Sequence, residues 1–83
     1  MRVFYFTASW CQPCKTFGPV MEKLAKDYDV TKIDIEQDMD STAFFGVMSV
    51  PTVVAVAEDR ELARFVGARP YDWVVDFLKE TEH

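Results

Sequence analysis

The sequence predicts an α/β fold, in which a mixed four-stranded sheet is flanked by three helices in the order βαβαββα. Residues 3–6 form a continuous apolar run within a predicted strand over residues 2–7, which is typical of a central strand buried on both faces. An apolar stripe at helical spacing follows from Cys11 onward, and the later segments 52–57 and 61–66 form a predicted hairpin. Because no linker or repeat interrupts the 83 residues, we expect one domain spanning residues 1–83.

The first helix is predicted to begin at Cys11, where the apolar period changes. Pro13 is tolerated in the first helical turn, whereas Pro19 is expected to kink the helix further in. The buried stripe of this helix is expected to consist of Phe17, Val20, Met21, Leu24, Ala25 and Tyr28.

The segment 30–36 alternates between apolar and polar residues, which predicts a half-exposed edge strand. A right-handed crossover through the first helix places this strand parallel to the first one. Asp38 or Asp40 is then predicted to cap a short helix that runs through Phe45 and stops at Gly46.

The hairpin turn, Glu58-Asp59-Arg60, lacks the expected glycine, so the sequence leaves its type open. Gly67 is predicted to end the sheet, and Pro70 to start the last helix. The buried stripe of that helix is expected to consist of Trp73, Val74, Phe77 and Leu78.

Charge and hydropathy exclude several classes of partner. The net charge of −5 and the lack of a basic run argue against nucleic acid, which is bound through clustered Lys and Arg. The longest apolar stretch, residues 53–57, is far too short to span a membrane, and the first residues show no targeting pattern. We therefore expect a cytoplasmic monomer that binds neither nucleic acid nor a membrane.

Cys11 and Cys14 have the spacing of a redox-active dithiol. At the start of a helix, free backbone amides and the helix dipole stabilise a thiolate, which is the form that attacks a disulfide. Cys11 lies at this start, while Cys14 lies one turn further in and is expected to be more sheltered. We therefore predict that Cys11 attacks and Cys14 resolves the mixed disulfide, with Gln12, Pro13 and Lys15 supporting the site.

Two other roles for a cysteine pair fit the sequence less well. Two cysteines at this spacing also form half of a zinc site, but the sole histidine is His83 and no second pair exists. We therefore expect no metal. A purely structural disulfide between Cys11 and Cys14 would close too small a loop to restrain the unfolded chain much.

Several separated segments resemble the thioredoxin family, and the chain looks like a small thioredoxin or glutaredoxin-like protein. Pro19 matches the helix-kinking proline of the family, and Gln12 stands where the family usually has glycine. The other matching segments are Ala8-Ser9-Trp10-Cys11-Gln12-Pro13-Cys14-Lys15, Lys32-Ile33-Asp34-Ile35-Glu36-Gln37-Asp38, Val50-Pro51-Thr52 and Gly67-Ala68. The resemblance implies a minimal thioredoxin fold.

The resemblance also implies a substrate-docking surface. Pro51 is expected to be cis, with its loop beside the dithiol and the Val50 backbone presented to an extended substrate segment. Trp10, Val50, Pro51, Gly67 and Ala68 are expected to frame an apolar docking patch around Cys11.

The sequence departs from the family pattern in two places that bear on the mechanism. The chain starts directly on the strand that leads into the motif, so its size is expected to be glutaredoxin-like. Tyr5 occupies the position of a buried Asp that accepts the proton of the resolving thiol, and Lys32 has lost that partner. The proton of Cys14 is then expected to pass to water, Lys32 or the Tyr5 hydroxyl, three routes that the sequence leaves open.

The resemblance implies a protein disulfide reductase that needs no cofactor beyond its own disulfide. A thioredoxin reductase would supply electrons, and disulfide-containing proteins such as ribonucleotide reductase would receive them. A glutaredoxin that uses glutathione is the nearest alternative; the short fold and Val50 favour it, whereas Gln12-Pro13 and Gly67-Ala68 do not. An alternative of another class is a docking module for a larger enzyme, in which the thiols are incidental.

Overall fold

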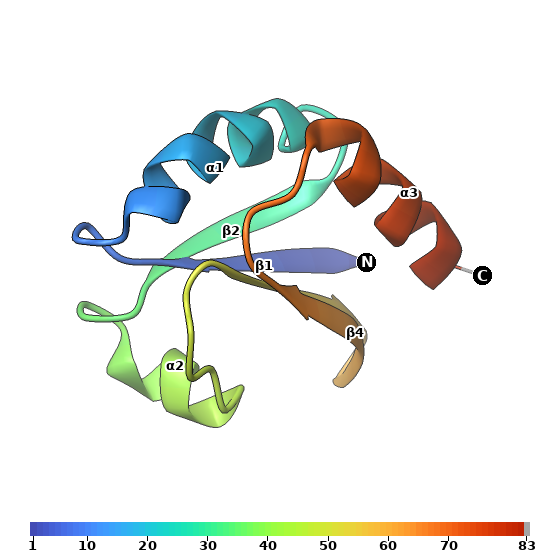
Figure 1. Ribbon diagram of the computed structural model, residues 1–83. Coiled ribbons are helices and arrows are strands. Elements are labelled where there is room, and N and C mark those ends of the chain that lie inside the picture. The colour runs from blue at the N-terminus through green and yellow to red at the C-terminus, as the bar shows by residue number, and fades with distance from the viewer. Residues whose placement is uncertain (83) are drawn as a thin grey trace.

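The computed structural model describes residues 1–82, and its elements follow the predicted order (Figure 1). The elements are β1 (Arg2–Thr7), α1 (Gln12–Leu24), β2 (Asp29–Asp34), α2 (Met39–Phe44), β3 (Thr52–Ala57), β4 (Arg60–Val66) and α3 (Tyr71–Thr81). The strand order is β2-β1-β3-β4; β1 pairs parallel with β2, and the other two pairings are antiparallel. The predicted α/β class, with its mixed four-stranded sheet and three helices, is confirmed.

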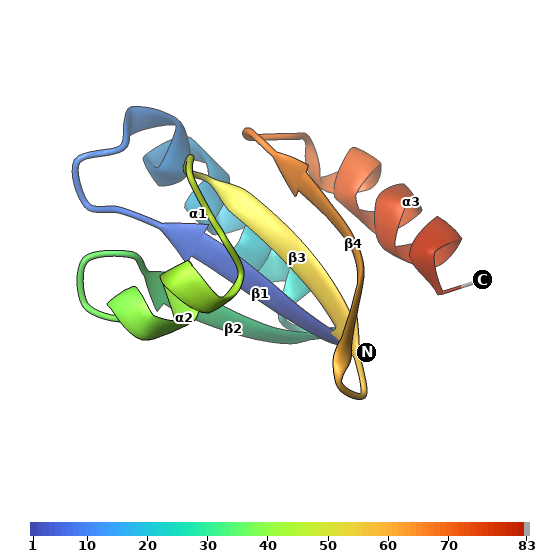
Figure 2. The same ribbon diagram turned by 90° about the horizontal axis from the view of Figure 1, so that it is seen from below.

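The sheet is covered by helices on both faces. Figure 1 shows α1 and α3 on one face and α2 on the other, and Figure 2 shows α2 lying over the β1 and β2 side. Successive residues of a strand point to opposite faces, so the central strand β1 supplies both layers. Tyr5 packs under α1 with Phe17, whereas Phe6 packs with Ile33 and Val54 beneath α2. This two-sided burial is what the apolar run at residues 3–6 predicts.

Helix α1 is shorter than its apolar stripe predicts. Phe17, Met21 and Leu24 are buried as expected, but the helix ends at Leu24. Ala25 is exposed, and Tyr28 lies half-buried in the turn, where its N–H donates to the Leu24 carbonyl at 3.0 Å. The prediction that the helix extends to Tyr28 is therefore wrong, because the chain must turn there to enter β2 at Asp29.

Helix α3 buries less of its predicted stripe. Val74 and Leu78 are fully buried, but Phe77 is only half-buried and Trp73 is 41% exposed. Trp73 stacks on Phe77 at 5.7 Å and meets Phe65 edge-on at 4.9 Å. The Trp73 ring meets Phe65 on β4, which is the edge strand of the described sheet, so no further strand lies beyond it to cover the rest of the side chain. The predicted burial of Trp73 is thus wrong.

The short helix and the hairpin settle two points that the sequence left open. Asp38 rather than Asp40 caps α2, because its carboxylate accepts a hydrogen bond from the Ser41 N–H at 3.0 Å. The hairpin turns at Glu58 and Asp59, since Ala57 pairs with Arg60. Glu58 provides the turn's positive φ, 58°, in place of a glycine.

Candidate active site

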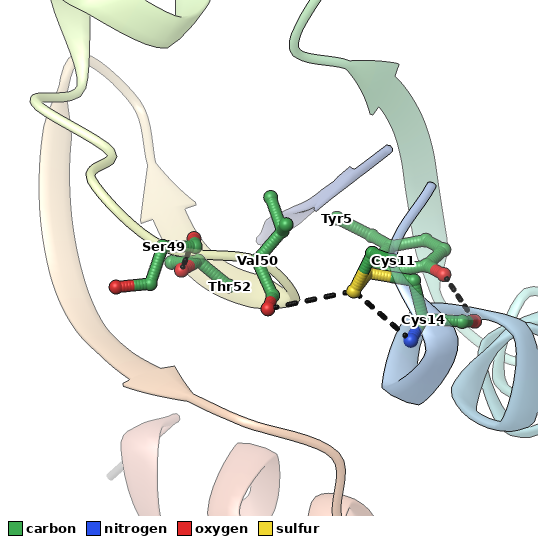
Figure 3. The surroundings of a disulfide bond; sticks show 6 residues. All are labelled: Tyr5, Cys11, Cys14, Ser49, Val50 and Thr52. Atoms are coloured by element: carbon green, nitrogen blue, oxygen red, sulfur yellow. Dashed lines mark hydrogen bonds between the residues drawn. A yellow bond between two sulfur atoms is a disulfide. The ribbon is translucent and has the colours of Figure 1, made fainter. Parts of the chain in front are cut away.

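Cys11 and Cys14 lie together where the chain passes from β1 into α1. Cys11 is the N-cap of the helix, with an extended backbone, and is joined to Cys14 by a disulfide with a Cα–Cα distance of 5.3 Å. The Cys14 N–H donates to the Cys11 sulfur at 3.3 Å (Figure 3). A helix N-terminus leaves such donors without backbone partners, and they favour negative charge on the atom they face. The arrangement therefore supports a thiolate at Cys11 after reduction.

The residues around the disulfide, rather than the sulfurs themselves, form the exposed surface. Cys11 and Cys14 are 5% and 3% exposed, so the expected difference in shelter between them is small in this oxidised form. Gln12 and Pro13 are exposed at the start of α1, and Trp10 is 64% exposed just before it. A partner thus meets these side chains before it reaches sulfur.

A second loop comes to the disulfide from the other side of the site. The Val50–Pro51 peptide bond is cis, as the resemblance implies. The Val50 carbonyl oxygen lies 3.6 Å from the Cys11 sulfur (Figure 3), where a reduced thiol can donate a hydrogen bond to it. Thr52 fixes this loop by donating its hydroxyl to the Ser49 carbonyl at 2.6 Å.

The structure divides the predicted docking residues into exposed and supporting ones. Trp10 and Ala68 are exposed, Val50 and Gly67 are half-buried, and Pro51 is buried. The Gly67 N–H donates to the Pro51 carbonyl at 2.8 Å and so ties the two loops together. The positive φ of Gly67, 98°, is one that side chains other than hydrogen rarely allow.

Sequence reasoning missed one member of this surface. Val66, the last residue of β4, is 50% exposed and lies directly before Gly67. The available signal in the sequence was an apolar residue directly before Gly67. The residue pattern along β4 did not show which face of the sheet Val66 occupies, so its exposure could not be predicted. The docking patch, as used below, consists of Trp10, Val50, Val66, Gly67 and Ala68.

Tyr5 and Lys32 lie behind the disulfide, on the α1 side of the sheet. They are paired in the parallel register of β1 and β2, and the buried Tyr5 donates its hydroxyl to the Cys14 carbonyl at 3.3 Å (Figure 3). Both line an open cavity of ≈ 520 Å³ that also borders Cys14. Glu22 and Asp34, which sequence reasoning did not single out, line the same cavity. Charged side chains therefore share solvent-accessible space with Cys14.

The described part of the chain contains neither a cluster suited to a metal ion nor a helix suited to a membrane. Within residues 1–82, no group of three or more His, Cys, Asp or Glu side chains is placed to hold a metal ion. His83, the sole histidine, lies outside the described residues. Over the same range, none of the helices is both long and apolar enough to cross a membrane.

A disulfide at a helix N-terminus, facing a cis-proline loop on this βαβαββα sheet, defines a thiol–disulfide oxidoreductase of the thioredoxin fold. Comparison with known proteins narrows that class. The thioredoxin family model matches residues 1–80, and the chain belongs to the thioredoxin family.

Individual relatives agree with the family match. The chain is 36% identical over 82 residues to the thioredoxin of Staphylococcus haemolyticus, an alignment that covers 94% of this chain and 79% of that protein. Among solved structures, thioredoxin 1 from Thermosipho africanus superimposes with a TM-score of 0.85 at 28% identity, covering 96% and 92% of the two chains. A mutant thioredoxin from Halobacterium salinarum gives a TM-score of 0.88 at 31% identity, covering 98% and 74%.

Proposed function

We propose that this oxidoreductase works as a cytoplasmic protein disulfide reductase, in which Cys11 attacks and Cys14 resolves. The observation that carries the proposal is the position of the Cys11 sulfur, between the Cys14 N–H at 3.3 Å and the Val50 carbonyl at 3.6 Å. The first contact stabilises a thiolate at Cys11, and the second marks where an extended substrate can pair with the Val50 backbone.

The proposed reaction transfers two electrons and needs no cofactor beyond the cysteine pair. The Cys11 thiolate attacks one sulfur of the substrate disulfide, forming a mixed disulfide and releasing the first substrate thiolate. The Cys14 thiolate then attacks the Cys11 sulfur, which closes the Cys11–Cys14 disulfide and releases the second substrate thiolate. A reductase that takes hydride from NADPH returns two electrons to the pair.

The docking patch supplies the substrate-binding surface in this proposal. Trp10, Val66 and Ala68 offer apolar contact area, while Val50 offers a backbone carbonyl. Exposed apolar side chains that surround a reactive group are a common feature of binding sites. Pro51 is buried beneath them, so its contribution is to shape the loop.

The electron donor distinguishes a thioredoxin activity from a glutaredoxin activity. We expect the protein to reduce insulin disulfides when supplied with NADPH and a bacterial thioredoxin reductase. A matched reaction with glutathione, glutathione reductase and NADPH should be much slower. Comparable or faster turnover with glutathione would overturn the thioredoxin-type assignment in favour of a glutaredoxin activity.

Replacing both cysteines distinguishes a disulfide reductase from a docking module. A Cys11→Ser, Cys14→Ser double variant should lose all disulfide reduction while keeping the fold. If that variant still supports every function of the parent in a reconstituted system, the thiols are incidental and the protein acts by docking.

A further inference from the structure

A small apolar groove adjoins the docking patch and has a role in none of the steps above. Its volume is ≈ 230 Å³, and it runs between α1 and the segment that joins β4 to α3. Ala68 belongs to both the groove and the docking patch, so the two surfaces are continuous. The groove is lined by Thr16, Phe17, Val20, Ala68, Arg69 and Pro70.

Arg69 is the charged member of this groove, and it is held in place without losing its exposure. Its guanidinium carbon lies 5.1 Å from the centre of the Trp73 ring, within the range of a cation–π contact. Trp73 is itself packed against Phe65 and Phe77. The arginine is therefore partly ordered before any ligand arrives, which lowers the entropic cost of using it.

The charge of Arg69 is available to a partner. The ion pairs found within residues 1–82 join Arg2 to Asp29 and Arg64 to Glu61, and Arg69 belongs to neither. Arg64, by comparison, bonds both to Glu61 and to the Phe45 carbonyl. Asp72 follows three residues after Arg69 in the first turn of α3, but it forms no ion pair with Arg69.

We propose that this groove selects the substrate, and that Arg69 favours disulfides flanked by an acidic residue. The inference rests on the proposed function. An extended segment whose cysteine meets Cys11 over the docking patch continues at Ala68 into the groove. There, an apolar side chain of the substrate contacts Phe17 and Val20, and a carboxylate reaches the guanidinium. Arginine suits this task because its planar donors match a carboxylate in two parallel hydrogen bonds.

Charge complementarity favours a substrate segment with an acidic residue as the occupant of the groove. The protein carries a net charge of −5, so a positive group beside the site is not a consequence of general basicity. Among the described residues, Arg69 is the single charged one that lines the groove, since the neighbouring Lys15 lines the cavity on the Cys14 side instead. A flanking lysine or arginine in the substrate meets a like charge here, whereas a flanking glutamate meets an opposite one.

The test uses symmetric disulfide dimers of short peptides, each with one cysteine and one variable residue. The variable residue is Glu, Gln or Lys, placed in turn at each position within about four residues of the cysteine. The protein is reduced and desalted beforehand, and its oxidation by each dimer is followed by the change in tryptophan fluorescence. No reductase is present, so the rate constants report the encounter with substrate alone.

At one or more positions, the parent should react roughly fivefold faster with the Glu peptide than with the Lys peptide, a size typical of one exposed charge pair. Arg69→Gln should remove the preference, and Arg69→Glu should reverse it. Added salt should shrink the preference in the parent. Arg60→Glu makes the same charge change at the hairpin, at the far end of β3 from the cis-proline loop, and should keep it.

The outcomes distinguish failure of the inference about Arg69 from failure of the proposed reductase function. If the parent oxidises readily with all dimers and Arg69→Glu changes no ratio at any position, the inference is wrong and the proposed function stands. If the reduced parent reacts with no peptide disulfide and no insulin disulfide, both are wrong.

Discussion

The Tyr5 hydroxyl donates a hydrogen bond to the backbone carbonyl of Cys14 at 3.3 Å, and it makes this contact from within the core beneath α1. The Tyr5 proton is thus directed to the carbonyl group of Cys14 rather than to its sulfur. Of the three routes that the sequence leaves open for the Cys14 proton, this geometry favours those through the open cavity that Cys14 shares with Lys32.

Replacing Tyr5 by Phe tests that assignment. The ring and its edge-on contact with Phe17 at 5.6 Å are kept, and only the buried hydroxyl is lost. We expect disulfide reduction to stay within about twofold of the parent at every pH, and the free energy of unfolding to fall by about 1 kcal/mol. Stopped-flow exchange kinetics and urea unfolding measure the two effects. A large loss of rate with an unchanged KM would instead give the hydroxyl a direct part in proton transfer.

Replacing Tyr5 by Asp tests whether the activation of Cys14 is less pH-dependent here than in relatives with an acid at this position. A carboxyl group in this buried place adds a titrating base near Cys14. We expect the pH–rate profile of the variant to gain a further ionisation and its resolving step to become faster above that ionisation. Tyr5→Asn, which has the same size without the charge, is the control. Identical profiles for the Asp variant and the parent would contradict the hypothesis.

The cap of α2 predicts a pH effect on stability. The Ser41 N–H, which donates to the Asp38 carboxylate at 3.0 Å, lowers the pKa of Asp38 below its ordinary value. Because the folded state has the lower pKa, the contribution of Asp38 to stability is complete above its unfolded pKa and disappears as the pH falls through the folded one.

Asp38→Asn isolates this contribution, since Asn caps helices almost as well but does not titrate. We expect the parent to lose more unfolding free energy than the variant as the pH is lowered through the ordinary pKa of Asp and below it, because the folded-state pKa of Asp38 is the lower of the two. Urea unfolding at a series of pH values measures the difference. Parallel curves for the two proteins would show that the cap does not titrate with folding.

The hairpin between β3 and β4 offers a stabilising substitution. Glu58 is the one non-glycine residue within residues 1–82 that has a positive φ, and a left-handed backbone costs a residue with a Cβ atom about 1 kcal/mol. Glu58→Gly should therefore raise the free energy of unfolding by an amount on the order of 1 kcal/mol. Asp59→Gly, one residue later, has no such strain to relieve and should stabilise nothing. Equal effects of the two changes would argue against strain at Glu58.

Much of the fold follows from patterns that act locally along the chain. The apolar run at residues 3–6 and the alternation at 30–36 predicted a central and an edge strand, because strand periodicity shows directly how many faces are buried. The position of Cys11 at the start of α1 was predicted from the change of apolar period at that residue. The cis bond before Pro51 was predicted from the family resemblance.

The features that escaped prediction depend on contacts between distant segments. Trp73 has the periodicity of a buried residue, yet it packs on Phe65 of the edge strand β4 and stays 41% exposed. The groove beside the docking patch joins Thr16 to Arg69, which lie far apart in the sequence and have no shared pattern. The direction of the Tyr5 hydroxyl likewise depends on where α1 places the Cys14 carbonyl.

The division of roles between the two cysteines is the central claim, and trapping of the mixed disulfide tests it most directly. Reduced Cys14→Ser and Cys11→Ser variants are each mixed with insulin, quenched with acid and analysed by intact mass. The account predicts that Cys14→Ser accumulates a covalent complex through Cys11, because the resolving sulfur is missing, while Cys11→Ser accumulates almost none. A complex that forms through Cys14 in the Cys11→Ser variant, at the rate seen for Cys14→Ser, would contradict it.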